Sequence, residues 1–253
     1  MSFDVAAESY DRFMGRYSVL LAPQLADLAG IEAGGRALDV GCGTGALTRE
    51  LVARLGPGAV AAADPSAPFV AAMGERFPGV EIHQAPAERL PFPDGAFDAT
   101  LAQLVVHFMP DPVAGLVEMA RVTRPGGVVA ACVWDHAGQH GPLAEFWQAV
   151  RELDPFAHDE SHLPGVREGH LVELFEAAGL AAVEGATLTA NLEHPSFEAW
   201  WEPFSHGVGP AGAYVATLDH EAQARLRERC RELLPDPRVV IRAKAWAARG
   251  LAP

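Results

Sequence analysis

Residues 38–45, Leu-Asp-Val-Gly-Cys-Gly-Thr-Gly, constrain the fold of this chain more than any other stretch. The apolar start predicts a buried strand, and the three glycines predict a sharp turn that a ligand can approach closely. Ala46, Leu47, Leu51 and Val52 follow with helical spacing. A strand, a glycine turn and a helix N-terminus are typical of a nucleotide site, because backbone N–H groups point at the ligand.

Strands and helices alternate regularly after this turn. Residues 59–63 form a short apolar strand that ends at Asp64. This acid lies about 20 residues past the first glycine, where a carboxylate accepts hydrogen bonds from ribose hydroxyls. Pro65 and Ser66 open a second helix, and residues 80–83 form a third strand. The spacing predicts an α/β fold with a doubly wound parallel sheet.

Two further strands follow a proline-rich loop. The fourth strand is expected at 99–106, and His107 lies just past its end, on the crevice side of the sheet. A helix at 112–122 and a tight turn at 124–127 precede a fifth strand at 128–134. Because this strand is largely apolar, it is expected to be central and covered on both faces.

The regular alternation stops beyond Trp134. The later elements that the pattern predicts are helices at 143–153, 167–178 and 219–234 and strands at 180–192 and 239–246. We expect a single domain over residues 1–253 with its ligand-binding core at 36–134. The remaining segments predict a lid over the crevice: N-terminal helices at 1–30 and insertions at 135–166 and 193–218.

The charge balance argues against some classes of partner. The net charge is −14, and affinity for nucleic acid comes largely from Lys and Arg, so nucleic acid is not expected as a partner. An anionic membrane surface is disfavoured for the same reason, and no apolar run is long enough to span a bilayer. Residues 1–5 lack the basic and apolar regions of a signal peptide. We therefore expect a cytoplasmic protein, either a monomer or a homodimer.

The cysteine and histidine patterns favour no metal. Cys42, Cys132 and Cys230 lack CxxC spacing and are expected as free thiols in a reducing compartment. Residues 158–162, His-Asp-Glu-Ser-His, depart from the H-E-x-x-H pattern because Glu160 falls one place late. A solvated acidic loop is the favoured interpretation of this stretch.

Four motifs occur in order at plausible distances. They are the glycine turn at 38–45, Asp-Pro-Ser at 64–66, Ala-Glu-Arg-Leu-Pro-Phe-Pro-Asp-Gly-Ala-Phe-Asp at 87–98 and Arg-Pro-Gly-Gly at 124–127. With them the chain resembles the class I S-adenosylmethionine-dependent methyltransferases, in the small-molecule branch related to the ubiquinone and menaquinone C-methyltransferases. The resemblance covers residues 36–134. It implies a Rossmann-like seven-stranded sheet of order 3-2-1-4-5-7-6 with the last strand antiparallel.

The resemblance also implies S-adenosyl-L-methionine as cofactor and a set of residues that hold it. The methionine end is implied to be held by Asp39 and by the backbone at Gly41, Cys42 and Gly43. The resemblance places Asp64 at the ribose, and Pro65 and Ser66 against the adenine or ribose. It places Ala87 and Glu88 at the adenine, and Gln103 and Leu104 under the sulfonium. Pro86 departs from the pattern, because family members often carry an acid there for the adenine amino group. Adenine recognition is therefore left to Glu88 or to backbone groups.

The expected reaction is methyl transfer to a small, largely apolar organic acceptor, with S-adenosylhomocysteine as product. Because the methyl group is already activated on a positive sulfur, alignment of the nucleophile can supply much of the rate. His107 is the candidate catalytic base, and its alternative role is to shape the pocket or cap the next turn. The candidate acceptor-binding residues are Tyr10, Met14, Tyr17, Trp134, His136, Trp200 and Trp201. Ordinary packing, or a solvated histidine, is the alternative for each of them.

Two other classes stay open at this point. Gly41, Gly43 and Ala46 also satisfy the dinucleotide fingerprint, so an NAD(P)-binding Rossmann oxidoreductase is a rival. Asp39 before the glycines and the motif at 90–98 favour the methyltransferase. A non-catalytic S-adenosylmethionine-binding protein is the third class, which the sequence disfavours only mildly.

Overall fold

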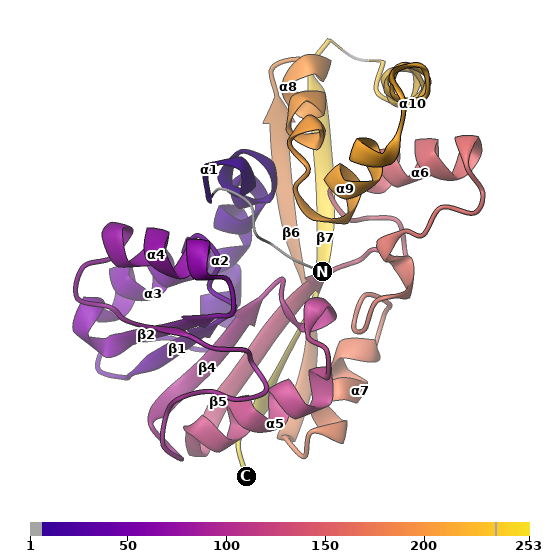
Figure 1. Cartoon of the computed structure of the whole chain (residues 1–253). Helices are drawn as coiled ribbons and strands as arrows, with labels where there is room; N and C mark the ends of the chain where they lie inside the picture. Colours follow the sequence, from indigo (N-terminus) through magenta and orange to yellow (C-terminus); the bar gives the residue numbers. More distant parts are fainter. Residues whose placement is uncertain (1–6, 236) are drawn as a thin grey trace.

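The computed structural model describes residues 7–235 and 237–253, and one seven-stranded sheet runs through them (Figure 1). The strands are β1 Ala37–Val40, β2 Val60–Asp64, β3 Glu81–Gln84, β4 Phe97–Gln103, β5 Thr123–Trp134, β6 Ala181–His194 and β7 Val239–Leu251. Their order is β3-β2-β1-β4-β5-β7-β6, and β7 runs antiparallel to both of its neighbours. The strand order and the antiparallel last strand predicted from the sequence are thus confirmed.

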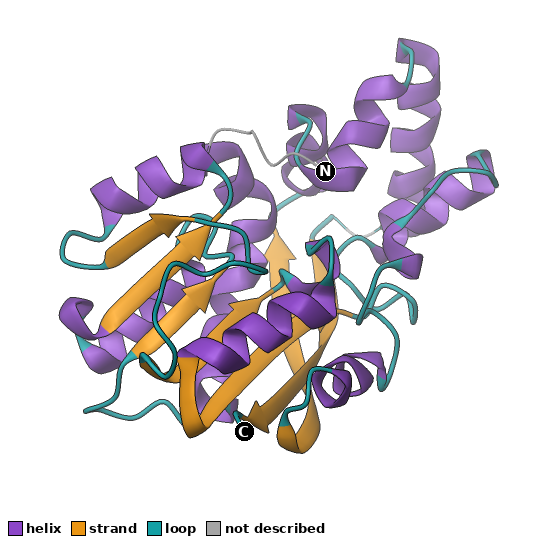
Figure 2. Ribbon diagram, turned by 60° about the horizontal axis from the view of Figure 1, so that its bottom comes forward, coloured by secondary structure: helices purple, strands orange, loops and turns teal. Residues whose placement is uncertain are grey.

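Helices lie on both faces of this sheet (Figure 2). The α-helices of the described residues are α1 Ala7–Tyr10, α2 Arg16–Leu28, α3 Ala46–Leu55, α4 Ala67–Arg76, α5 Pro112–Val122, α6 Ala144–Leu153, α7 His170–Ala177, α8 Phe197–Trp201, α9 Gly209–Thr217 and α10 His220–Leu233. The helices α2 and α3 share one apolar core with the sheet, and α5 and α7 share the other. The sheet is therefore covered on both faces, which explains the apolar run in its central strands.

The pleat of β1 assigns its side chains to opposite faces. Leu38 and Val40 pack in the core on the α5 side, whereas Ala37 packs in the core on the α3 side. Because side chains alternate along a strand, Asp39 shares the face of Ala37 and points at α3. This alternation brings a carboxylate under the helix that follows the glycine turn.

The structure corrects two boundaries around β4 and β5. The strand expected at 99–106 ends at Gln103, because Leu104 adopts a left-handed backbone with φ of 62° that interrupts the strand. The turn expected at 124–127 lies within β5 as an irregularity. Phe97 pairs with Thr123, but Ala99 pairs with Val128, so the extra residues bulge out of the ladder.

The last two strands are longer than the sequence pattern predicted. They pair from Glu184 opposite Arg249 to His194 opposite Val239, beyond the expected ends at 192 and 246. Ala243, Ala245 and Ala247 fill one face of β7. Alanine has little preference for strands, so this alternation carried a weak signal.

The far ends of β6 and β7 carry a helical layer formed by α8, α9, α10 and α6 (Figure 1). Its centre is an aromatic cluster in which the Phe204 ring stacks on Phe146, with centroids 4.5 Å apart, and meets the edge of Phe13 at 5.1 Å. The N-terminal segment, α6 and the segment after α8 thus share one core. The part of the expected 1–30 segment before Ala7 lies outside the described residues.

Candidate active site

The glycine turn follows β1 directly. Gly41, Gly43 and Gly45 all have positive φ, which L-residues with a side chain rarely adopt. At Gly41 a Cβ would also lie 2.4 Å from a methyl group of Val105, so only glycine fits there. The Gly41 N–H donates to the Ala63 carbonyl at 2.7 Å and fixes the turn to the end of β2.

Two buried carboxylates flank this turn. The Asp64 oxygens accept from the Gly43 N–H at 2.9 Å and from the Ser66 N–H at 2.8 Å, and Asp39 Oδ2 accepts from the Thr48 hydroxyl at 2.6 Å. Asp39 is 1% exposed and Asp64 6%. Burial raises the pKa of both carboxyls, that of Asp39 to about 7. Neither has an ion pair with Lys or Arg among the described residues, so the turn is suited to a cationic ligand.

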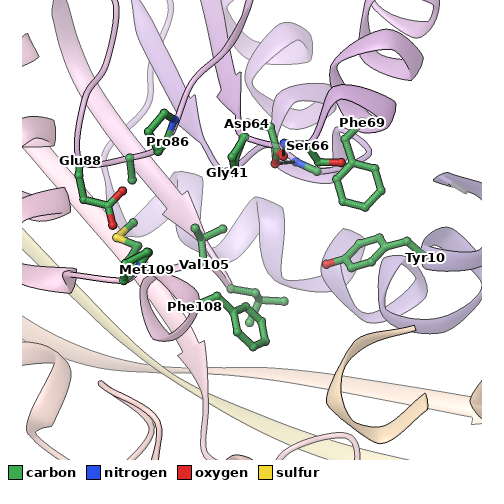
Figure 3. A pocket seen from close by; sticks show the side chains of 15 residues that line it. Tyr10, Gly41, Asp64, Ser66, Phe69, Pro86, Glu88, Val105, Phe108 and Met109 are labelled. Atoms are coloured by element: carbon green, nitrogen blue, oxygen red, sulfur yellow. Dashed lines mark hydrogen bonds between the residues drawn. The ribbon is translucent and has the colours of Figure 1, made fainter. Parts of the chain in front are cut away.

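A cavity of about 510 Å³, here called the main cavity, opens at the carboxyl ends of β1, β2 and β4 (Figure 3). Its lining residues are Tyr10, Gly41, Gly43, Asp64, Pro65, Ser66, Phe69, Pro86, Ala87, Glu88, Leu104, Val105, Phe108, Met109 and Pro110. This is the edge where the strand order reverses between β1 and β4, the usual ligand site of open α/β sheets. Its volume suits a nucleoside-sized ligand.

Most of the predicted cofactor-binding residues line the main cavity, namely Gly41, Gly43, Asp64, Pro65, Ser66, Ala87, Glu88 and Leu104. Three others lie behind the wall. Asp39 faces Thr48, and Cys42 packs under the turn with Ala62. Gln103 donates to the Ser18 carbonyl of α2 at 2.9 Å, and its Oε1 has no hydrogen-bond partner among the described residues.

Several apolar lining residues were missed by sequence reasoning. Phe69 on α4 meets the edge of the Tyr10 ring with centroids 5.5 Å apart, and Figure 3 shows Tyr10 reaching across toward Phe108. Val105, Phe108 and Met109 complete the floor. Apolar residues after a strand end look like core residues, so no pattern distinguished them.

A second, smaller space, here called the inner chamber, adjoins the main cavity. It measures about 40 Å³ and is lined by Tyr10, Phe13, Met14, Leu104, His107, Phe108, Trp134, His136, Leu143, Glu160, Val208, Gly209, Pro210 and Ala211. Tyr10, Leu104 and Phe108 line both spaces. The chamber thus brings together the candidate base His107 and four of the candidate acceptor-binding residues, Tyr10, Met14, Trp134 and His136.

The polar wall of the inner chamber consists of two histidines and one glutamate. The rings of His107 and His136 lie with centroids 5.9 Å apart, and His136 Nε2 is 3.8 Å from Glu160 Oε1. The Trp147 indole N–H donates to Glu160 Oε2 at 3.0 Å. Burial lowers the pKa of both histidines, most strongly that of His107.

This arrangement corrects the expectation of a solvated loop at 158–162. Glu160 is only 4% exposed. Its carboxylate turns inward because Trp147 on α6 offers a buried donor, a partner that lies 13 residues away in the chain. Among the described residues, no three His, Cys, Asp or Glu side chains are grouped so as to hold a metal ion. No helix in the same part of the chain is long and apolar enough to cross a membrane.

Comparison with known proteins identifies the family. A methyltransferase domain model matches residues 38–131. The ubiquinone/menaquinone biosynthesis C-methyltransferase of Bdellovibrio bacteriovorus is 28% identical over 214 residues, which cover 76% of this chain and 91% of the relative. The 2-methyl-6-phytyl-1,4-hydroquinone methyltransferase of Synechocystis is 30% identical over 177 residues, which cover 68% of this chain and 54% of the relative.

A solved structure agrees on the fold. A putative methyltransferase from Bacillus halodurans superimposes with a TM-score of 0.58 at 18% identity, covering 92% of this chain and 98% of its own. The chain belongs to the class I S-adenosylmethionine-dependent methyltransferases. Its cofactor is S-adenosyl-L-methionine, which leaves the oxidoreductase alternative without support.

The site of this methyltransferase fits a sulfonium cofactor. The two buried carboxylates without cationic partners, Asp39 and Asp64, favour a positive ligand beside the turn. Val105 fills the space where a Cβ of residue 41 would lie. Because Gly41 has no side chain, its backbone stays accessible from the main cavity. Glu88 Oε1 accepts from the Asp111 N–H at 3.3 Å, which holds this acid at the cavity edge beside Pro86.

The remaining candidate acceptor residues lie outside both spaces. The Tyr17 hydroxyl is hydrogen-bonded to His194 Nε2 at 2.8 Å, between α2 and β6. Trp200 is buried in the aromatic cluster, and Trp201 is partly buried against the same core. These positions agree with the alternative interpretation of the three side chains as packing residues.

Proposed function

We propose that this methyltransferase transfers a methyl group to a small, largely apolar organic acceptor and releases S-adenosylhomocysteine. The observation that carries the proposal is the inner chamber, which opens beside the main cavity and shares Tyr10, Leu104 and Phe108 with it. An acceptor whose head occupies the chamber would therefore lie next to the cofactor. Phe13, Met14 and Trp134 give this space a mostly apolar wall.

In this proposal the main cavity holds the cofactor. Asp64 would accept hydrogen bonds from the ribose hydroxyls, while its two bonds to backbone N–H groups keep the carboxylate in place. Pro65 and Ser66 would contact the adenine or ribose, and Ala87 and Glu88 the adenine. The backbone at Gly41, Cys42 and Gly43 would hold the methionine end.

Asp39 and Gln103 lie outside the lining and would act through electrostatics and structural support. Asp39 lies behind the turn, where its carboxylate would favour the positive charge of the cofactor. Gln103 joins β4 to α2, and Leu104 forms the floor between the two spaces. When bound, the cofactor supplies a methyl group on a positively charged sulfur, so orientation of the acceptor by the chamber is the main contribution expected of the protein.

Other properties support a small acceptor. Two of the similar proteins are small-molecule methyltransferases by name, one of ubiquinone and menaquinone biosynthesis and one of a phytyl hydroquinone. The net charge of −14 disfavours nucleic acid. All three cysteines are free and buried, which supports our proposal of a reducing, cytoplasmic location.

A screen of small acceptors tests the proposal. The full chain is incubated with S-adenosylmethionine and a panel of phenols, hydroquinones, amines and carboxylic acids, and S-adenosylhomocysteine formation is measured. We expect turnover with apolar ring compounds and none with oligonucleotides. If calorimetry shows cofactor binding but no compound in a broad panel is methylated, the proposed acceptor class is wrong and the non-catalytic alternative is favoured.

A further inference from the structure

We propose that the inner chamber recognises an acidic hydroxyl of the acceptor, such as that of a phenol or enol, and that His107, His136 and Glu160 together take up its proton. The inference rests on the proposed small-molecule acceptor and specifies which functional group that acceptor carries. The inference adds Glu160, which the sequence predicted in a solvated loop, to the groups that take up the proton. It also assigns His136 to this group, beside the candidate base His107.

Unsatisfied nitrogen atoms are the first observation. His107 Nδ1 and His136 Nε2 are buried and have no hydrogen-bond partner among the described residues. His107 is 3% exposed. A buried polar atom without a partner destabilises the folded chain, so such atoms indicate a site that a ligand completes.

The spacing of the two rings suits one oxygen atom. With centroids 5.9 Å apart, the rings are close enough for a single hydroxyl oxygen to lie within hydrogen-bond distance of a nitrogen on each. A hydroxyl both donates and accepts, so it can satisfy two imidazoles at once. The chamber volume of about 40 Å³ exceeds what one water needs and admits the hydroxyl with the carbon that carries it.

Glu160 adds the charge that proton uptake requires. Its Oε1 is 3.8 Å from His136 Nε2, and its Oε2 is held by the Trp147 N–H at 3.0 Å. Apo contacts of this kind often tighten when the ligand binds. A carboxylate at this position stabilises an imidazolium, and burial keeps both imidazoles neutral and able to accept until the acceptor arrives.

The proton transfer itself is simple. The O–H bond of the acceptor breaks, its electron pair stays on the acceptor, and the proton forms an N–H bond on an imidazole ring. On His136 the resulting imidazolium is paired with the Glu160 carboxylate, whose Oε1 lies 3.8 Å from Nε2. A neutral amine attacks through its own lone pair and needs no such base, whereas a hydroxyl is a weak nucleophile until it loses its proton. The arrangement of His107, His136 and Glu160 therefore favours an acceptor that carries a hydroxyl.

A binding experiment tests this inference without turnover. The chain is saturated with S-adenosylhomocysteine, and its affinity for 4-nitrophenol is compared with that for 4-nitrotoluene, in which a methyl group replaces the hydroxyl. We expect 4-nitrophenol to bind about 10–100-fold more tightly, the range expected for a hydrogen bond to a charged group. The phenolate absorption band of the bound 4-nitrophenol should also increase relative to free probe at the same pH.

Variants separate this role from a structural one. Glu160→Gln still accepts from Trp147, and His136→Phe keeps a ring in the wall; both should abolish the preference for the hydroxyl and the phenolate band. Affinity for 4-nitrotoluene and S-adenosylhomocysteine should stay the same. Glu168→Gln makes the same chemical change at an exposed carboxylate and should behave like the wild type.

The outcomes separate the two proposals. Equal affinity of the wild type for both probes would overturn the inference, and so would a preference that survives in both variants. Methylation of amines or non-hydroxylic carbons, with Glu160→Gln fully active, would reject the hydroxyl but keep the small-molecule function. Failure to methylate any small compound would reject that function, and the binding comparison would still decide whether the chamber recognises a hydroxyl.

Discussion

Asp39 and Asp64 show how one turn uses two carboxylates in different positions. Asp64 lines the main cavity and is held by two backbone N–H groups, whereas Asp39 lies behind the turn and is held by Thr48. Burial raises the pKa of both, which is a cost to the folded chain without ligand. In the proposed site a cationic cofactor offsets this cost, so the two carboxylates would favour binding at the expense of stability.

Asp64→Asn tests the ribose role at the residue scale. The amide has a similar shape but accepts weaker hydrogen bonds, so we expect the affinity for S-adenosylmethionine to fall by about 10–100-fold. Isothermal calorimetry measures the change. Asp94→Asn, at a side chain 84% exposed, is the matched control and should bind normally. Unchanged affinity in a folded Asp64→Asn variant would remove Asp64 from the ribose role.

Gly41 and Gly43 offer a second comparison at this scale. A Cβ at Gly41 would clash with Val105, whereas a Cβ at Gly43 meets nothing within 4 Å. Both have positive φ. We expect Gly43→Ala to lower the free energy of unfolding by about 1–2 kcal/mol through backbone strain, and Gly41→Ala by about 2–4 kcal/mol because overpacking is added. Urea denaturation measures both values, and equal losses would contradict the proposed clash.

At the scale of elements, four hydrogen bonds join α2 to β6. Arg16 donates to His194 Nδ1 at 3.0 Å, and because arginine can only donate, His194 carries its proton on Nε2 and donates to the Tyr17 oxygen. Gln24 donates to the Thr189 carbonyl at 2.8 Å and accepts from the Thr189 N–H at 3.1 Å. The N-terminal helix is thereby fixed to the long strand pair that carries the helical layer.

The buried hydrogen bonds of His194 predict that the stability of the fold depends on pH. Burial, followed by the charge of Arg16, lowers the pKa of His194 from 6.5 to about 4. The unfolded chain then binds more protons than the folded chain between these two values. The stability that His194 contributes is therefore fully present above pH 6.5 and is lost as the pH falls toward about 4.

Chemical denaturation across this pH range checks the prediction. His194→Phe removes the titrating group and should flatten the decline of unfolding free energy, although other buried histidines will still contribute to it. The difference between wild type and variant isolates His194. A decline of the same steepness in the variant would show that His194 does not carry the effect.

At the scale of the whole molecule, topology decides where the ligand binds. The sheet order reverses between β1 and β4, so the loops after these strands diverge and leave the main cavity at their carboxyl ends. The inner chamber adds a second compartment. Its walls come from the segment after β4, the end of β5, the segment between β5 and the loop that holds Glu160, the N-terminal segment and the start of α9, so it exists only in the assembled fold.

Ligand binding should therefore stabilise the whole fold. With S-adenosylhomocysteine at 100 times its dissociation constant, the free energy of unfolding should rise by about 2.7 kcal/mol, because the unfolded chain has no such site. Thermal or urea unfolding with and without ligand measures the rise. NAD at the same concentration should leave the transition where it is, and a comparable shift with NAD would contradict the assignment of the cofactor.

The sequence by itself determined the core of the fold and the edge of the sheet at which we propose that the cofactor binds. The alternation of apolar strands and helices predicted a doubly wound sheet, since local periodicity and turn residues specify such elements directly. The resemblance to the methyltransferases implied the strand order, which the structure confirms. Spacing in the chain also indicated Gly41, Gly43 and Asp64, which all line the main cavity. These features could be predicted because each depends on neighbours within a few residues or on one repeated unit.

Only the tertiary structure decided how the inner chamber is built. Glu160 was expected in solvent, yet a hydrogen bond from Trp147 turns it inward beside His136. Tyr17 was expected near the acceptor, yet His194, 177 residues away, holds it between α2 and β6. The burial of a polar side chain depends on a partner that folding brings from a distant part of the chain, and no local pattern encodes that partner.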